Sequence, residues 1–486
     1  MSMSLQFWGA TQEVTGSCHL LRVNGESLLL DCGLIQGGRQ DELRNHEAFP
    51  FAPESLTAVV LSHAHIDHSG RLPLLVKQGF SGPIYTHKAT MELCAIMLKD
   101  AAMLQQRDAE RQNRKRAKQD LEPIEPLFTE EDVELALTRF IPLDYGTKLD
   151  PIPGVTLCLS DAGHILGSAL LELWINDGNT QKKLVFSGDL GRAGMPILRD
   201  PTLIQQADLV LMESTYGDRL HRSWEATLEE LKGIFATAIS ESRGNILIPA
   251  FSVGRAQELL YLFHLYAGEW DLSRWKICLD SPMAIEATKV YINNYPLMDE
   301  DFKRFVHQHP GQHPLLSGIE FIQSTEESME LNDVHQGLII IAGSGMCNGG
   351  RIRCHLEHNL WRPECDIIIC GFQALGTPGR LLVDGASELT INGNSVNVAA
   401  RIHTVGGLSA HADQAELLRW YREFEGAPPL ILVHGEPDAQ RQLLSVLEHA
   451  DGVQPKPRPQ ASAIATEGDK LDLSRLPELS WVVGDI

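Results

Sequence analysis

The 486-residue sequence has no Cys-x-x-Cys pair, no apolar run long enough to cross a membrane and no excess of basic residues. Its nine cysteines are scattered and odd in number, which argues against a disulfide framework or a zinc finger and favours a reducing compartment. The N-terminus lacks the basic and apolar segments of a secretory signal. We therefore expect a cytoplasmic protein with no membrane partner.

The charge is strongly acidic, because 41 basic and 64 acidic residues give a formal net charge of −23. Such a balance argues against a protein that coats duplex nucleic acid through a general positive field. Residues 107–118 are a local exception, with six basic and two acidic side chains. A solvated helix face is the favoured interpretation of this run, and an RNA contact is the alternative.

The order of predicted elements indicates a β-rich parent with an inserted βα module. Apolar runs at 27–31, 56–62 and 183–187 predict short strands in the first 200 residues, and 88–138 is expected to be helical. From about residue 208 strands and helices alternate, which is typical of an open parallel sheet. The strands expected there are 209–212, 246–248, 276–279, 338–342 and 367–370, and the helices are 224–242, 254–267 and 283–294. Short strands return at 395–405, followed by a helix near 413–424, a strand at 430–433 and an extended turn at 454–459.

The most informative motif is His63-Ala-His65-Ile-Asp67-His68, directly after an expected strand. Three imidazoles and a carboxylate within six residues are ligands suited to zinc. On an extended segment His63 and His65 point to one side, so both can reach one metal. Asp67 and His68, at the start of a helix, point elsewhere and can serve a second metal.

Further polar residues each stand just past an expected strand, and they are Asp31, His164, Asp189 and His434. Strand ends are where a layered fold fixes catalytic groups while its loops leave them open to substrate. Any one of these residues alone would more often be structural. Together with the histidine cluster they indicate a metal site.

This series of residues resembles the metallo-β-lactamase superfamily. Glu213 in Met-Glu-Ser-Thr-Tyr-Gly, His411 in Ser-Ala-His-Ala-Asp and His434 in Val-His-Gly-Glu resemble its β-CASP branch, which includes the pre-mRNA 3′-end endonuclease. The resemblance runs from about residue 5 to about 450 and is greatest to the short bacterial members. It implies an α/β protein, a metallo-β-lactamase αββα sandwich with an inserted β-CASP parallel α/β domain. The implied domains are 1–207 and 393–486 for the sandwich and its tail, and 208–392 for the insertion.

The resemblance also implies a dinuclear site with two zinc ions, for which manganese could compete. One ion falls to His63, His65 and His164, the other to Asp67, His68 and His434, and Asp189 bridges them. In such a site two ions hold a hydroxide nucleophile against a phosphoryl oxygen. Asp31 is expected to orient a ligand histidine from behind.

The catalytic residues implied are Asp67, Asp31, His411 and Glu213. His411 is the expected general acid for the leaving oxygen, and Glu213 is expected to hold it as an imidazolium. The function implied is a ribonuclease that hydrolyses single-stranded RNA at a cleft between the two domains, in RNA processing or decay. Endonucleolytic cleavage is favoured, and 5′→3′ exonucleolytic cleavage and homodimer formation stay open.

Three alternatives remain beside this hypothesis. A small-molecule thioesterase or lactonase would need neither the insertion nor the His411–Glu213 pair. A DNA nuclease of the branch typically carries an apolar residue where this chain has His434. A catalytically silent RNA-binding scaffold would lose ligands, whereas this chain keeps them all. His65 also favours zinc over a redox di-iron site, whose relatives carry glutamate at that position.

Glycine- and serine-rich turns in the insertion predict phosphate-binding loops, because helix N-termini present free N–H groups. Such turns line up along the carboxyl edge of an open α/β sheet. The residues expected to contact RNA phosphates are Ser252, Arg255, Arg351 and Arg380. The histidines of 307–313 look metal-like, but a proline and a glycine interrupt them, so a surface loop is the prediction there.

Overall fold

The computed structural model describes residues 3–242, 244–371, 373–374, 376–449 and 458–482, so most of the extended turn expected at 454–459 lies outside the described residues. The chain forms two compact units. The first comprises Met1–Ala193, Asp200–Leu220 and His411–Ile486, and the second comprises Gly194–Arg199 and His221–Ala410. The domain limits expected at 207/208 and 392/393 are not the limits of these units and stay a prediction.

The first unit contains two seven-stranded sheets. One has the strand order β22 (Lys470–Asp472), β1 (Met3–Phe7), β2 (His19–Val23), β3 (Glu26–Leu30), β4 (Ala58–Val60), β5 (Ile84–His87) and β6 (Phe140–Leu143). The other has the order β21 (Ser462–Ile464), β20 (Leu430–Leu432), β11 (Leu209–Met212), β10 (Gln181–Phe186), β9 (Ala169–Asn176), β8 (Val155–Asp161) and β7 (Lys148–Ile152).

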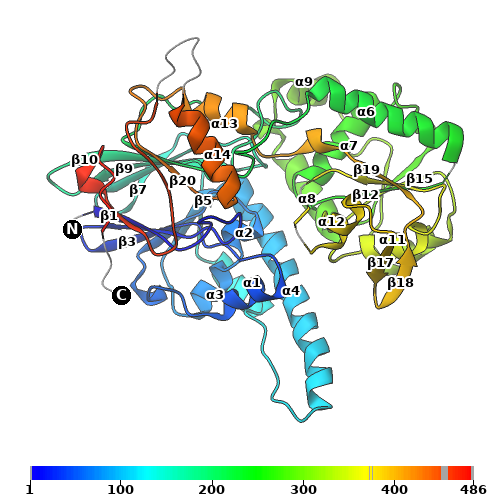
Figure 1. Cartoon of the computed structure of the whole chain (residues 1–486), viewed down its shortest axis with the longest axis horizontal. Helices are drawn as coiled ribbons and strands as arrows, with labels where there is room; N and C mark the ends of the chain where they lie inside the picture. Colours follow the sequence, from blue (N-terminus) through cyan, green and yellow to red (C-terminus); the bar gives the residue numbers. More distant parts are fainter. Residues whose placement is uncertain (1–2, 243, 372, 375, 450–457, 483–486) are drawn as a thin grey trace. The chain divides into compact units, whose positions relative to one another are not determined.

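Alternation of side chains along the strands builds two cores on the second sheet. In β9, Leu171, Leu173 and Ile175 join a core with residues of the first sheet, which places the two sheets face to face. Leu170, on the opposite face of β9, joins a core with α13 (Gln414–Tyr421) and α14 (Pro437–Glu448). Helices α2 (Ile66–Ser69), α3 (Leu72–Lys77), α4 (Lys88–Ala117) and α5 (Glu130–Leu137) lie on the outer side of the first sheet (Figure 1). The layers are therefore αββα, as expected.

Helix α4 is 30 residues long, and its two halves differ in packing. The first half buries a regular set of small and apolar side chains, which are Ala89, Thr90, Leu93, Cys94, Leu98 and Ala102. The second half buries only Ala109. The helix ends at Ala117, and the segment that follows cannot continue it because Pro123 and Pro126 lack the N–H that a helix needs. The expected helical span 88–138 is thus two helices with an extended return between them.

The second unit is built on a six-stranded parallel sheet, with the order β14 (Ile319–Phe321), β13 (Lys276–Leu279), β15 (Leu338–Ala342), β12 (Ile246–Pro249), β16 (Asp366–Ile369) and β19 (Arg401–Thr404). β15 is buried along its whole length, as a central strand covered on both faces requires. Helices α11 (Ile352–Asn359) and α12 (Pro378–Val383) pack against it. The alternating strand–helix pattern of the sequence is confirmed here.

The helices expected at 224–242, 254–267 and 283–294 correspond to α6 (Trp224–Thr237), α7 (Arg255–Tyr266) and α8 (Pro282–Asn293). The unit also contains α9 (Glu300–Gln308), α10 (Thr325–Glu330) and the hairpin of β17 (Glu388–Ile391) and β18 (Asn394–Asn397). α6 ends earlier than expected, and 238–242 form a wider helical turn. No described helix of the chain has both the length and the apolar character needed to cross a membrane.

Candidate metal centre

The predicted ligands come together within the first unit because they follow strands that end at neighbouring positions. The motif His63–His68 follows β4 and enters α2, whose residues include Asp67 and His68. Asp189 follows β10 and His434 follows β20, and both strands run parallel to β11, which lies between them. His164 lies in the loop that joins β8 to β9.

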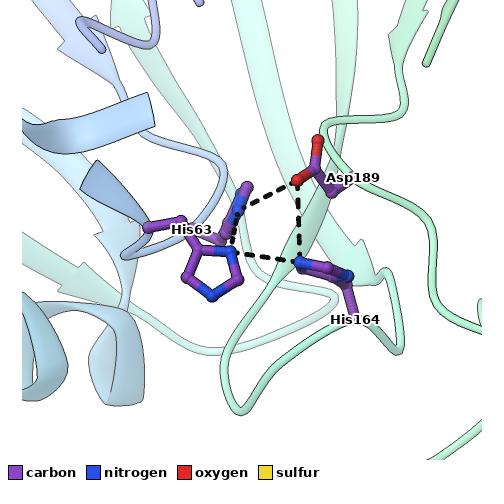
Figure 2. A group of neighbouring side chains, drawn as sticks. His63, His164 and Asp189 are labelled. Atoms are coloured by element: carbon purple, nitrogen blue, oxygen red, sulfur yellow. Dashed lines mark hydrogen bonds and ion pairs between the residues drawn. The ribbon is translucent and has the colours of Figure 1, made fainter. Parts of the chain in front are cut away.

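The first group of ligands is His63, His65, His164 and Asp189, whose donor atoms all lie within 4.8 Å of one another. His63 Nε2 is 3.2 Å from His65 Nδ1, and His164 Nε2 is 3.1 Å from the same atom. Asp189 Oδ2 lies 3.4 Å from His63 Nε2 and 3.6 Å from His164 Nε2. Figure 2 shows the imidazoles of His63 and His164 turned toward the Asp189 carboxylate.

The second group is Asp67, His68 and His434. The Nε2 atoms of His68 and His434 lie 3.1 Å apart, and Asp67 Oδ2 is 3.5 Å from His434 Nε2. The other oxygen of Asp189 reaches this group, with Oδ1 3.2 Å from His68 Nε2 and 3.5 Å from His434 Nδ1. Asp189 thus stands between the two groups and presents one carboxylate oxygen to each.

These residues fit divalent cations on the chemistry of their donor atoms. Ring nitrogens that face each other near 3.1 Å cannot all carry protons, and a cation between them satisfies their lone pairs together. Asp189 Oδ1 is buried and makes no well-aligned hydrogen bond among the described residues, although His68 Nε2 lies 3.2 Å away. Two imidazole–carboxylate groups that share one aspartate are therefore suited to two adjacent ions.

The electrostatics of the two groups differ. Burial, together with the neighbouring His63 imidazole, lowers the pKa of His65 to about 3, so this ring is neutral and free to ligate. Burial opposes a charge on His68, but the Asp189 and Asp31 carboxylates outweigh it and raise the pKa of His68 well above its ordinary value. The second group therefore requires positive charge, which a metal ion can supply in place of the proton.

A third cluster adjoins the first group and contains Glu213 and His411 beside Asp189. His411 Nδ1 is 3.2 Å from Glu213 Oε1 and 3.9 Å from Asp189 Oδ2. Burial lowers the pKa of His411, but the carboxylates of Glu213 and Asp189 overcome this effect and raise it to about 9. Glu213 is fully buried, whereas the His411 side chain keeps 22% of its surface exposed. A charged, partly accessible imidazole therefore stands next to the ligands.

Models of three protein families match the chain. They are the metallo-β-lactamase superfamily over residues 11–156, the Beta-Casp domain over 256–382, and the Zn-dependent metallo-hydrolase RNA specificity domain over 395–455. A ribonuclease of Thermus thermophilus is 41% identical over 432 residues, which cover 88% of this chain and 92% of that protein. The chain belongs to the β-CASP branch of the metallo-β-lactamase superfamily.

Other relatives of this β-CASP protein are archaeal. The transcription termination factor FttA of Methanocaldococcus jannaschii is 31% identical over 444 residues, covering 89% of this chain and 67% of the factor. The factor of Pyrococcus abyssi is 31% identical over 92% of this chain and 68% of its own length. A solved protein of unknown function from Enterococcus faecalis has a TM-score of 0.53 at 12% identity, covering 97% of this chain and 100% of that one, and this likeness concerns the fold.

The structure places Asp31 behind the second ligand group, at the position that the sequence predicts for an orienting residue. Its Oδ2 lies 2.7 Å from His68 Nδ1, on the side of the ring opposite His434. Asp31 is fully buried, and Ser62 anchors it by donating its N–H to Oδ1 at 2.7 Å and its hydroxyl to Oδ2 at 2.9 Å. Ser17 donates a third hydrogen bond at 3.1 Å. The carboxylate is therefore positioned to orient His68.

Replacing Asp31 by asparagine is expected to weaken metal binding at the second group by about 10–100-fold, because the amide cannot hold His68 in the same way. Titration of the metal-free protein with zinc, followed by calorimetry, measures this change. Asp150→Asn, at an exposed carboxylate of β7, is the matched control and should bind zinc as the unaltered protein does. Equal zinc affinity in the Asp31 variant would contradict the orienting role.

Several residues that hold the site escaped sequence analysis. Thr215 Oγ1 lies 3.1 Å from His434 Nδ1, and the Leu190 N–H donates to Glu213 Oε1 at 2.7 Å. Ser62 and Ser17 anchor Asp31 as described above. Thr215 stands inside the motif that carries Glu213, and Ser62 directly precedes His63, so their place in or beside a motif could have indicated them. No sequence signal points to the Leu190 backbone or to Ser17.

The predicted phosphate-binding residues all lie in the second unit, and their contacts are within that unit. Ser252 Oγ is 3.2 Å from Ser281 Oγ, so the loops after β12 and β13 meet at the carboxyl edge of the parallel sheet, as expected. Arg255 is buried and pairs with Glu258. Arg351 reaches the buried Asp280 at 2.6 Å.

Arg380 is the fourth of these residues and bonds Asp384 at 2.9 Å. Each of the three arginines thus has an acidic partner inside its own unit, and phosphate contact by them stays a prediction. The histidines of 307–313 lie at the end of α9 and in the loop after it. His307 and His309 are exposed and His313 is half-buried, and the interpretation of 307–313 as a surface loop stays a prediction.

Proposed function

We propose that this β-CASP protein is a zinc-dependent endoribonuclease that hydrolyses phosphodiester bonds of single-stranded RNA. The observation that carries the proposal is the pair of ligand groups that share Asp189, with the His411–Glu213 pair directly beside them. This arrangement combines the requirements of phosphodiester hydrolysis, which are charge stabilisation and a proton for the leaving oxygen.

We assign one zinc ion to His63, His65 and His164 and a second to Asp67, His68 and His434, with Asp189 shared between them. When bound, the two ions supply Lewis acidity and activate water as a nucleophile at neutral pH. Asp31 keeps the Nε2 atom of His68 directed at the site. Asp67, at the first turn of α2, supplies the carboxylate of the second group.

His411 is assigned the transfer of a proton to the leaving 3′ oxygen. Glu213 lies on its Nδ1 side, so Nε2 is the atom that points away from the carboxylate and can donate to substrate. Glu213 is held by the Leu190 N–H and by the Thr215 N–H at 3.3 Å, which keeps the acceptor fixed while His411 acts. The products of this reaction carry a 3′-hydroxyl and a 5′-phosphate.

The choice of RNA rests on two features. His434 occupies a position at which DNA-repair members of the branch typically carry an apolar residue, and the family model over 395–455 is that of an RNA specificity domain. The presence of all seven ligands argues against a catalytically silent scaffold. The His411–Glu213 pair argues against a thioesterase or lactonase, which needs no such proton donor.

Cleavage assays with a panel of substrates test this function. The zinc-loaded protein is incubated with a labelled single-stranded RNA, the DNA of the same sequence and an acyl thioester. We expect cleavage within the RNA chain, slower cleavage of the DNA and no thioester hydrolysis. Faster cleavage of the DNA or of the thioester, or release of mononucleotides from the 5′ end as the first products, would overturn the proposal. Metal analysis of the same sample should give two ions per chain.

A further inference from the structure

The outer half of α4 and the residue that caps its C-terminus carry five basic residues on one face, which are Arg107, Arg111, Arg114, Lys115 and Lys118. Their spacing of i, i+4, i+7, i+8 and i+11 places them within a sector of about 100° when each residue turns the helix by about 100°. We call these five residues the basic stripe. All five side chains are exposed.

The opposite face of this half-helix is covered by the segment that returns toward α5. Ala109 is buried there, Asn113 Nδ2 donates to the Ile124 carbonyl at 2.9 Å, and Arg116 Nε donates to the Glu122 carbonyl at 2.6 Å. Figure 1 shows α4 and the returning segment projecting beyond the sheets of the first unit. The basic stripe therefore faces solvent on a two-layered arm whose other side is packed.

The charges of the basic stripe are mostly uncompensated. Over the described ranges, only Arg114 has an acidic side chain at salt-bridge distance, and Glu110 stands at 4.0 Å from it. Like charges at i, i+4 destabilise a helix, and Arg107, Arg111 and Lys115 form such a series. The repulsion among these positive charges lowers the stability of the helix, and binding of a polyanion offsets it, although the chain as a whole has a net charge of −23.

The stripe is connected to the metal centre through α4, whose first turn contacts one of the loops that form the centre. In the first turn of α4, Thr90 Oγ1 donates to the Gly167 carbonyl at 2.7 Å, in the loop that carries His164. At about 1.5 Å per residue, Arg107 lies about 26 Å along the helix from Thr90, and the stripe is about 16 Å long. A strand held by the stripe is therefore held many nucleotides away from the bond that is cut.

We propose that the basic stripe is a distal binding site for the phosphate backbone of single-stranded RNA and favours long substrates over short ones. The proposal rests on the proposed function, because RNA is the polyanion that the metal centre is inferred to cleave. The length of the stripe matches about four to five stacked nucleotides at about 3.4 Å each. Its charges carry no base recognition, so binding is independent of sequence and sensitive to salt.

The test compares two variants with the same change in net charge. In the stripe variant all five residues of the basic stripe are changed to glutamine, which keeps helix propensity. The matched control carries glutamine at five cations that are elsewhere in the chain, are exposed or half-buried, and have acidic partners, which are Lys232, Arg274, Lys276, Lys289 and Arg304. Circular dichroism should be unchanged in both.

Binding is measured in an Asp67→Ala background with a fluorescent RNA of about thirty nucleotides, so that the readout is independent of cleavage. We expect the stripe variant to lose at least about tenfold in affinity, and the slope of log K against log salt to fall by up to about 3.5, at about 0.7 for each lost contact. The control should change less than twofold. Equal losses of affinity in both variants would mean that the total charge of the protein, and not the position of the basic stripe, determines RNA binding, and would overturn the proposal.

Cleavage by the otherwise unaltered protein gives a second readout. The stripe variant should show a raised KM and an unchanged kcat on the long RNA, and no change on an RNA of about five nucleotides, which spans about 17 Å and cannot reach the stripe. If the metal centre cleaves no RNA, the proposed function fails while the binding result still decides the stripe. Tighter binding of phosphatidylserine vesicles than of RNA, lost in the stripe variant, would assign this surface to membranes and overturn the RNA proposal.

Discussion

Replacing Asp189 by asparagine is expected to lower kcat for RNA cleavage by about 10³-fold or more and to leave less than one metal ion per chain. The carboxylate lies between 3.2 and 3.6 Å from ring nitrogens of four histidines, two in each ligand group. It is 1% exposed, so solvent cannot take over its charge. An amide of the same shape presents no negative charge to either group, and both should bind metal more weakly.

The comparison with Asp67→Asn makes this expectation specific. Asp67 belongs to the second group, where its Oδ2 lies 3.5 Å from His434 Nε2. The Asp67→Asn variant should therefore lose the ion of the second group and keep the ion held by His63, His65 and His164. Metal analysis after dialysis should give two ions for the unaltered protein, one for Asp67→Asn and fewer for Asp189→Asn. Asp208→Asn, at a partly exposed aspartate between β10 and β11, serves as control. Two retained ions in the Asp189 variant would contradict its shared position.

The fold could be predicted from the sequence wherever a pattern is local. The run at 338–342 coincides with β15, because a central parallel strand is apolar on both faces and needs no partner to be recognised. The candidate metal-binding residues could be selected for a similar reason, since four of the seven lie in one short motif after a strand and the other three each stand just past an expected strand. The expected helical span of 88–138 is wrong in its middle, because it includes Pro123 and Pro126, which lie in the extended segment between α4 and α5.

The contacts that could not be predicted are those between residues far apart in the chain. Arg351 was expected to bind phosphate, but its acidic neighbour Asp280 is 71 residues away and no single sequence shows that they meet. The same holds for Ser17 on Asp31 and for the Leu190 N–H on Glu213. The basic run at 107–118 is visible in the sequence, but which of its side chains face solvent depends on the face of α4 that the returning segment covers. Such pairings depend on tertiary packing, which residue patterns do not encode locally.

Replacing His411 by alanine is expected to lower kcat on natural RNA by about 10²–10⁴-fold, the usual contribution of a general acid. The physical reason is that a 3′ alkoxide is a poor leaving group unless a proton reaches it as the bond breaks. The Nδ1 atom of His411 is occupied by Glu213 at 3.2 Å, and the partly exposed ring offers Nε2 for this transfer. Single-turnover cleavage of a labelled RNA measures the loss, and His307→Ala, at an exposed histidine in the last turn of α9, is the control.

A leaving group that needs no proton separates this role from the alternatives. In an RNA with sulfur in place of the bridging 3′ oxygen at one linkage, the departing thiolate is stable without protonation. His411→Ala should then cleave that linkage within about tenfold of the unaltered protein, because only the protonation step has been removed. If the loss is as large on the sulfur linkage as on natural RNA, His411 acts otherwise. Asp189, Glu213 and His411 themselves form a group that could hold a cation. Loss of a metal ion from the His411→Ala variant would then identify His411 as a ligand.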